Sequence, residues 1–437
     1  MKTPKGPKLN LNRLIYVVTT LPILFIAALI LHYGVNVPTF DQWELVPYLE
    51  RMGNHTLSFT YMIAQHNEHR IAFPRLIMLG LANLTNWNMI AEMIVSLGLQ
   101  ILSFVFIWKA IGRTLNGRLA AIVTLIASIC MFNPMQWENW LWGWQIQWYL
   151  TILGMIAALY FCWYLPLRQR SLNHIMAISA ATVATFSLAG GMVTWGILLV
   201  FLAFRKQLKA FAVYLVVAIA NVGLYLNNYH PVAGHTPIHL LFSNQLDFFR
   251  YISLYLGGSI SNDDQVAPLL GAITIAIFLI LGIKAVLERQ TKSYFWLAIA
   301  SFVLVNAMIT GSGRFSLGPE QALASRYTSF SLLWLLSIVT LSSSYIYKAA
   351  TKRSEWLQPV SISVTVVLFA IFTVNSLGGV TASKAYRIKN QSASECLNAS
   401  NKPHSSCFSL VYPSNPITDN RNTQYLMFLR GEHLAGR

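Results

Sequence analysis

The sequence has few charged residues. They make up 11% of its 437 positions, whereas an ordinary soluble domain carries roughly 25%. So few charges cannot cover the surface of a water-soluble protein of this length, which excludes a chain of soluble domains. The sequence is 55% apolar and 13% aromatic, which excludes an intrinsically disordered protein. The composition therefore predicts an all-α, polytopic membrane protein.

Acidic residues are the scarcer of the two charged kinds. The chain has 15 Asp and Glu against 31 Lys and Arg, and its formal net charge is +16. Such an excess has two possible origins, which are a nucleic-acid partner or the basic bias that orients membrane helices. The positions of the basic residues decide between them.

A phosphate-binding loop of the GxxxxGK[ST] type is missing as well. The connections predicted on the cytoplasmic side are too short to fold into a nucleotide-binding domain. An ABC-type ATPase, a kinase and a cytosolic nucleotide-sugar enzyme are therefore not expected within this chain. Only four cysteines occur, and Cys396 and Cys407 lie in the predicted outer tail, where an oxidising compartment would permit a disulfide.

Long apolar runs are abundant. A membrane-spanning helix needs about 20 apolar residues, and the sequence predicts about eleven such spans, at 14–33, 88–108, 119–133, 146–165, 174–189, 191–204, 210–227, 267–286, 294–310, 328–347 and 358–379. The pair at 174–204 is broken by Ala189-Gly190-Gly191. Two short or re-entrant helices meeting at a buried glycine turn are expected there.

The basic residues follow the positive-inside rule when the N-terminus is cytoplasmic. This arrangement places 18 basic residues inside, six in outer loops and the remainder in the tail. The excess is thus an orientation signal, and no nucleic-acid partner is predicted. We expect a multi-pass protein of the inner (plasma) membrane, N-in and C-out. It divides into a bundle over 1–379, with a large first outer loop at 34–87, and an outer tail over 380–437.

The first outer loop opens with two acids. Asp41 and Glu44 are three residues apart and would share one face of a helix lying along the membrane surface. Both are candidates for a catalytic base, with Asp41 preferred. A second surface helix is expected over 71–84, which is too short to span and contains Pro74.

A polar run lies between these two helices. It holds His66, Glu68, His69 and Arg70, which could supply a general base and cationic anchors for a substrate. A solvated, salt-bridged loop is the alternative. A zinc site built from His66, His69 and Glu68 is a further possibility, although the spacing differs from HExxH.

The second outer loop is rich in tryptophan, with five between residues 137 and 148. Glu138, Trp140 and Gln145 belong to this loop, and indole faces beside amide and carboxylate groups suit sugar rings. An interfacial aromatic belt is the alternative interpretation. Gln145 and Gln147 extend toward the membrane, where polar groups are usually functional or paired.

A further outer loop, at 311–327, contains two arginines. Arg314 and Arg326, followed by Tyr327, could clamp a phosphate or pyrophosphate at the mouth of the bundle. The alternative is that they snorkel or pair with Glu320.

Together these motifs resemble the polytopic glycosyltransferases of the GT-C fold class. The resemblance extends over most of the chain up to about residue 330. It rests on the order of several motifs and on their common outer placement. These motifs are Asp41, the run His66-Asn67-Glu68-His69-Arg70, Phe73-Pro74-Arg75-Leu76, Glu138-Asn139-Trp140 through Gln147, Phe186 through Gly191 with Trp195, and Ser325-Arg326-Tyr327. One departure concerns the acid motif. The class often has two adjacent acids, whereas Asp41 is followed by Gln42.

The resemblance implies an integral membrane glycosyltransferase. Such an enzyme takes a sugar from a polyprenyl-phosphate carrier and gives it to a glycan, lipid or protein acceptor at the outer membrane face by inverting displacement. The expected partners are therefore the lipid-linked donor, the acceptor and the bilayer. No cofactor is predicted with certainty, although a divalent metal is possible. The rivals are a flippase or transporter of lipid-linked glycans, which would carry charges deep inside its spans, and an accessory subunit without catalysis.

Overall fold

The structure is a computed structural model that describes residues 11–164, 170–232, 243–350, 357–399 and 405–411. Within these ranges every regular element is a helix, and the one β contact is an isolated bridge between His66 and His69. The prediction of an all-α fold is confirmed.

Eight stretches of the described chain are long and apolar enough to cross a membrane: Leu11–Tyr33, Met89–Thr114, Gly117–Leu141, Gly143–Trp163, Leu208–Leu226, Val266–Leu287, Thr291–Leu317 and Ser325–Ile346. They contain the long helices α1 (Leu11–Val18), α2 (Leu21–Tyr33), α6 (Met89–Thr114), α7 (Gly117–Met131), α9 (Ile146–Trp163), α12 (Leu208–Leu226), α15 (Val266–Leu287), α16 (Tyr294–Arg314) and α17 (Thr328–Ala350). Helices α1 and α2 together match the predicted span at 14–33, and each of the other helices begins within two residues of a predicted span. The predicted spans at 174–189, 191–204 and 358–379 are not among these eight stretches.

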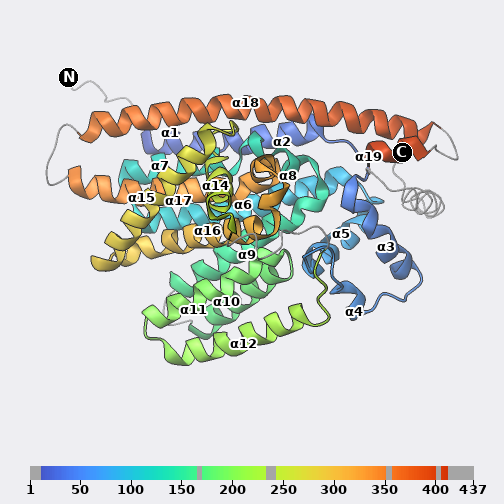
Figure 1. The fold of residues 1–437 in the computed structure, drawn as a ribbon, viewed down its shortest axis with the longest axis horizontal. Coiled ribbons are helices and arrows are strands. Elements are labelled where there is room, and N and C mark those ends of the chain that lie inside the picture. Colours follow the sequence, from blue (N-terminus) through green and yellow to red (C-terminus); the bar gives the residue numbers. More distant parts are fainter. Residues whose placement is uncertain (1–10, 165–169, 233–242, 351–356, 400–404, 412–437) are drawn as a thin grey trace, which may run out of the picture.

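The degree of burial separates central helices from peripheral ones. The apolar window of Gly143–Trp163, which contains α9, is 83% buried, whereas that of α12 is only 17% buried. Helix α9 therefore lies at the centre of the bundle, and α12 offers most of its apolar surface to the surroundings (Figure 1). Helix α14 (Gln245–Gly257) packs against α15 and α16.

The region 174–204 is broken as predicted. Helix α10 (Arg170–Thr185) and helix α11 (Val193–Phe204) are separated by the 3-10 turn η5 (Ala189–Met192), which holds the buried Gly190 and Gly191. A Cβ atom at Gly191 would lie 1.8 Å from the backbone carbonyl oxygen of Ala184. The turn is therefore packed so closely that only glycine fits.

The first outer loop folds into short helices at one end of the bundle, on the right of Figure 1. They are the 3-10 turn η1 (Phe40–Leu45), α3 (Val46–Gly53), α4 (Phe59–Met62) and α5 (Ala72–Thr85). Helix α5 buries Met78, Leu79 and Ala82 and exposes Leu76 and Leu84. This is the amphipathic pattern of the surface helix expected over 71–84.

Helix α18 (Leu357–Asn398) passes through the predicted boundary between bundle and tail at 379/380. Its 42 residues extend for about 63 Å, twice the roughly 30 Å of a bilayer core. It runs the length of the bundle and contacts α2 and the 3-10 turn η2 (Pro134–Gln136) (Figure 1). The Cys396–Cys407 disulfide joins its end to α19 (Ser405–Val411). The remainder of the predicted tail lies outside the described residues.

Candidate active site

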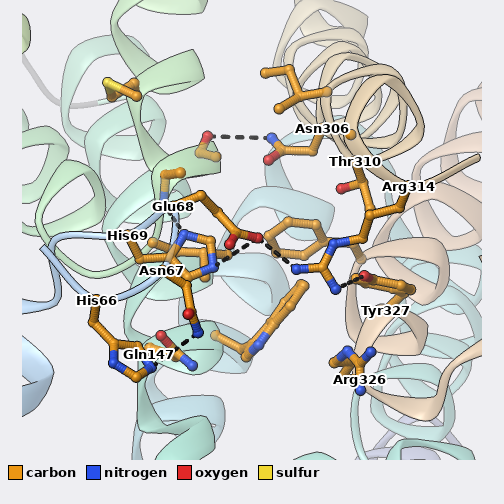
Figure 2. A pocket seen from close by; sticks show the side chains of 18 of the residues that line it. His66, Asn67, Glu68, His69, Gln147, Asn306, Thr310, Arg314, Arg326 and Tyr327 are labelled. Atoms are coloured by element: carbon orange, nitrogen blue, oxygen red, sulfur yellow. Dashed lines mark hydrogen bonds and ion pairs between the residues drawn. The ribbon is translucent and has the colours of Figure 1, made fainter. Parts of the chain in front are cut away.

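A polar cavity of about 570 Å³ lies among the first outer loop, the tryptophan-rich loop, the η5 turn and the ends of α12 and α16. Eight of the candidate residues from the sequence line it: Asp41, His66, Glu68, His69, Gln145, Arg314, Arg326 and Tyr327. They come from three loops that are far apart in the sequence. The loops predicted to lie outside therefore converge on one site, which Figure 2 shows from close by.

The polar run forms a tight turn at the cavity wall. His66 and His69 exchange two backbone hydrogen bonds of 2.7 and 2.8 Å, and Asn67 adopts the left-handed conformation with φ of 49°. Asparagine tolerates this conformation better than most residues. The turn places the side chains of Glu68 and His69 in the cavity (Figure 2).

Arg70 does not line the cavity, in contrast to its prediction as a substrate-binding residue. Its guanidinium is buried and donates hydrogen bonds to the carbonyl oxygens of Ile63, Tyr225 and Asn227. The Tyr225 hydroxyl in turn donates to the Glu68 carbonyl over 2.9 Å. Arg70 therefore holds the turn against the end of α12 and has no donor group in the cavity.

Glu68 forms an ionic link across the cavity. Its Oε1 atom lies 2.6 Å from Arg314 Nη2 and 3.6 Å from His69 Nε2, and Arg314 Nη1 donates to the Tyr327 hydroxyl over 3.1 Å (Figure 2). The Glu68 and Arg314 side chains are 19% and 26% exposed. The link therefore joins the first loop to the end of α16 in a setting that is shielded from bulk water.

The protonation states of this pair follow from its surroundings. Burial alone would raise the pKa of Glu68, but His69 and the Arg314 guanidinium outweigh it and lower the pKa to about 2. Burial lowers the pKa of His69 to about 4, although Glu68 acts in the opposite direction. His69 Nδ1 accepts the Ala189 N–H over 3.2 Å. At neutral pH His69 is thus uncharged and carries its proton on Nε2, facing Glu68.

These pKa values predict that acid destabilises the fold. His69 binds a proton more readily when unfolded, with an ordinary pKa of 6.5 against about 4 in the fold. Glu68 likewise has an ordinary pKa of 4.5 against about 2. Both groups therefore contribute to the free energy of unfolding at neutral pH. As the pH falls, the contribution of His69 is lost between pH 6.5 and 4, and that of Glu68 between pH 4.5 and 2. Thermal unfolding of the detergent-solubilised protein across pH should show this decline.

The contribution of His69 can be isolated by substitution. In His69→Gln the decline in Tm between pH 6.5 and 4.5 should be smaller than in the wild type, because the titrating group is gone. His55→Gln, at an exposed position outside the cavity, should leave the profile unchanged. Equal profiles for all three proteins would contradict the assignment.

Asp41 is the most accessible carboxyl group at the site. Its side chain is 32% exposed, against 19% for Glu68 and 20% for Glu138. Asp41 Oδ2 lies 3.4 Å from His66 Nε2, and the His66 ring packs edge-on against Trp144. Asp41 therefore lies beside a histidine and can still be reached by a molecule that enters the cavity.

Arg326 is held by Glu138. Both the backbone N–H and the Nη1 group of Arg326 donate to this carboxylate, over 3.0 and 3.2 Å. Glu138 does not line the cavity, so the structure gives it a supporting role in place of the predicted substrate contact. The two arginines thus pair with Glu68 and Glu138 rather than with Glu320.

Two further candidates lie away from the cavity. Trp140 is fully buried, stacks on Tyr149 at a centroid distance of 4.8 Å and donates its indole N–H to the Asn133 carbonyl. It is a core residue, contrary to the prediction of a substrate contact. Glu44 follows Asp41 by one turn toward α3 and is not part of the cavity wall.

The cavity also contains polar residues that the sequence did not single out. Asn306, within α16, donates to the Gly190 carbonyl over 3.3 Å and lines the cavity. A polar side chain inside an apolar span was the signal that could have identified it. Gln145 and Gln147, which were singled out, are buried in the wall, and within the described chain their Oε1 atoms lack a hydrogen-bond partner.

The predicted zinc ligands do not form a cluster. His66 pairs with Asp41, while His69 pairs with Glu68. Across the described ranges, no group of three His, Cys, Asp or Glu side chains is arranged to hold a metal ion. We therefore derive no step through a metal.

A second cavity, apolar and about 530 Å³ in volume, lies between α11 and α16. It is lined along α11 by Gly196, Val200 and Phe204, which are exposed on the surface of the bundle. Met192, in the η5 turn, belongs to both cavities. This second cavity, called the apolar channel below, reaches the exposed surface of α11 and adjoins the polar cavity at Met192.

No protein-family model matches the chain, and no curated protein is significantly similar to it.

Proposed function

We propose that the protein is an integral membrane glycosyltransferase that uses a polyprenyl-phosphate sugar and acts at the outer face of the plasma membrane. The observation that supports the proposal is that three features of the structure border a single cavity. An accessible carboxylate, two arginines and an apolar side channel all border the same cavity. A sugar phosphate on a lipid tail is a ligand that uses all three.

The reaction follows from the placement of Asp41. Its carboxylate takes the proton of an acceptor hydroxyl, and the acceptor oxygen attacks the anomeric carbon of the donor sugar. The new C–O bond forms as the bond from that carbon to the phosphate oxygen breaks, and its electron pair leaves with the phosphate. The products are the glycosylated acceptor, with inverted configuration, and the polyprenyl phosphate.

The leaving phosphate gains negative charge, which the arginines are placed to stabilise. Arg314 and Arg326 line the cavity with Tyr327 beside them. Each already contacts a carboxylate, and this pairing fixes the direction of its guanidinium before substrate arrives. Preorganised charges of this kind commonly contribute about 3–4 kcal/mol to transition-state stabilisation.

The apolar channel fits the lipid tail of the donor. Its walls are the side chains of α11 and α16, and it meets the polar cavity at Met192. A tail lying there would place the phosphate at the polar end. Glycosyl transfer rather than transport is favoured because most of the charged groups of the site come from outer loops and helix ends.

The channel supports a prediction at Gly196. A Cβ atom there meets nothing within 4 Å, so Gly196→Phe should fill the channel without disturbing the fold. We expect the KM for a long-chain polyprenyl-phosphate sugar to rise about tenfold, which corresponds to about 1.4 kcal/mol. The KM for a short-chain donor analogue should change little.

Gly223→Phe is the matched control. Gly223 lies on the exposed surface of α12 in equally open space and does not border the channel. Its KM values should equal those of the wild type. The tail assignment is wrong if both variants have the same effect, or if Gly196→Phe impairs short and long donors equally.

The direct test of the function is incubation of purified protein with a panel of polyprenyl-phosphate sugars and candidate acceptors. Release of polyprenyl phosphate together with a glycosylated acceptor supports the proposal. Movement of the intact lipid-linked glycan across a vesicle membrane, without cleavage, would instead identify a flippase.

A further inference from the structure

The turn that carries Asp41 is tied to the bundle through its neighbour, Gln42. The Gln42 side chain is 2% exposed and points away from solvent. Its Nε2 group donates to Glu92 Oε2 over 2.8 Å, and its Oε1 atom accepts the Thr39 backbone N–H over 3.0 Å. One amide thus connects the start of η1 to helix α6.

The same amide is also connected to α18. The Thr39 hydroxyl donates to Gln42 Oε1 over 3.3 Å and lies 3.1 Å from the Tyr386 hydroxyl. Either hydroxyl can donate in this second contact. A chain of hydrogen bonds therefore links Tyr386 through Thr39 and Gln42 to Glu92.

The tryptophan-rich loop closes over this chain. Trp142 donates its indole N–H to the Thr39 carbonyl over 3.0 Å. A Cβ atom at Gly143 would lie 2.2 Å from Glu92 Oε2 and 3.0 Å from Gln42 Nε2. The backbone of this loop thus covers the amide–carboxylate pair, so water cannot replace either partner.

We infer that Gln42 is a positioning residue that sets the place of Asp41 in the cavity through its bond to Glu92. This inference rests on the proposed function of Asp41. It also accounts for the departure from an acidic pair at positions 41 and 42. A second acid at position 42 would place two carboxyl groups at hydrogen-bond distance in a buried site, where both cannot be ionised together.

The test exchanges the amide of Gln42 and the carboxyl group of Glu92 between the two positions. Gln42→Glu removes the amide donor and leaves two buried carboxyl groups that must share a proton, and it should lower kcat about 100-fold, the scale of a 1 Å misplacement. KM should change little, because the proposed phosphate-binding residues Arg314 and Arg326 are not altered. The double variant Gln42→Glu/Glu92→Gln restores one amide and one carboxylate and should recover most of the lost kcat. Tyr386→Phe keeps the ring against Trp137 and should give a smaller fall in kcat.

Hydrogen exchange of the backbone amides of residues 39–45 supplies a measurement that does not need activity. Exchange should be faster in Gln42→Glu and Tyr386→Phe and return toward wild type in the double variant. Unchanged exchange and kcat in Tyr386→Phe, or a folded double variant without recovery, would overturn the inference. If the wild type transfers no sugar, the proposed function fails, and the exchange data still decide whether Gln42 holds the turn.

Discussion

Replacing Asp41 with asparagine is expected to lower the rate of sugar transfer by about 10²–10⁴-fold, the usual contribution of a general base. Asparagine has almost the same shape and can still contact His66, but its amide cannot accept the proton of the acceptor hydroxyl. The fold should be unaffected, because Asp41 is the most exposed carboxyl group of the site. The measurement is the initial rate of transfer from a polyprenyl-phosphate sugar at saturating acceptor.

Glu44→Gln is the control for this experiment. Glu44 was the second candidate for the base, and it lies in the same η1 turn outside the cavity wall. Its variant should retain the wild-type rate within about threefold, on the scale of an ordinary surface substitution. Full activity in Asp41→Asn, with loss in Glu44→Gln, would reverse the assignment.

Arg314→Gln should lower kcat by about 10²–10³-fold, comparable with the removal of one preorganised charge-stabilising group. The variant removes a cation from the position where the leaving phosphate becomes more negative. It also takes away the partner of Glu68, whose carboxylate is largely shielded from water. A lower Tm is therefore expected beside the lower rate.

The two effects can be separated. In Arg314→Gln/Glu68→Gln no carboxylate is left without its cation, so the Tm should recover while kcat stays low. Arg250→Gln removes another outer arginine, one that is exposed and outside the cavity, and should change neither quantity. If kcat recovers together with Tm in the double variant, Arg314 has only a structural role.

The sequence was sufficient to predict the membrane helices, since a span must satisfy its backbone hydrogen bonds internally and be apolar over about 20 residues. Both requirements are local, and each of the eight long apolar stretches begins within about three residues of a predicted span, whereas α18 continues to Asn398, beyond the predicted end at 379. The same holds for the glycine break at Gly190 and Gly191. The Cys396–Cys407 pairing, which was left open, is present as a disulfide.

The sequence could not distinguish arginines with equal local surroundings. Arg70 and Arg314 were both predicted to lie in polar outer loops, yet Arg70 is buried by its bonds to three backbone carbonyls, while Arg314 ends α16 and lines the cavity. The difference depends on Tyr225 and Asn227, which lie more than 150 residues away in the chain. Trp140 and Trp144 differ in the same manner, because only Trp144 reaches the cavity.

What the sequence determined by itself was the all-α membrane architecture and the residue types available in the outer loops. These follow from composition and from apolar runs of about 20 residues. The tertiary structure alone decided which carboxylate faces which cation, and that Asp41 shares a cavity with Arg314 and Arg326. The physical reason is that ion pairs and hydrogen bonds act over about 3 Å, a distance that only the packing of separate helices brings about.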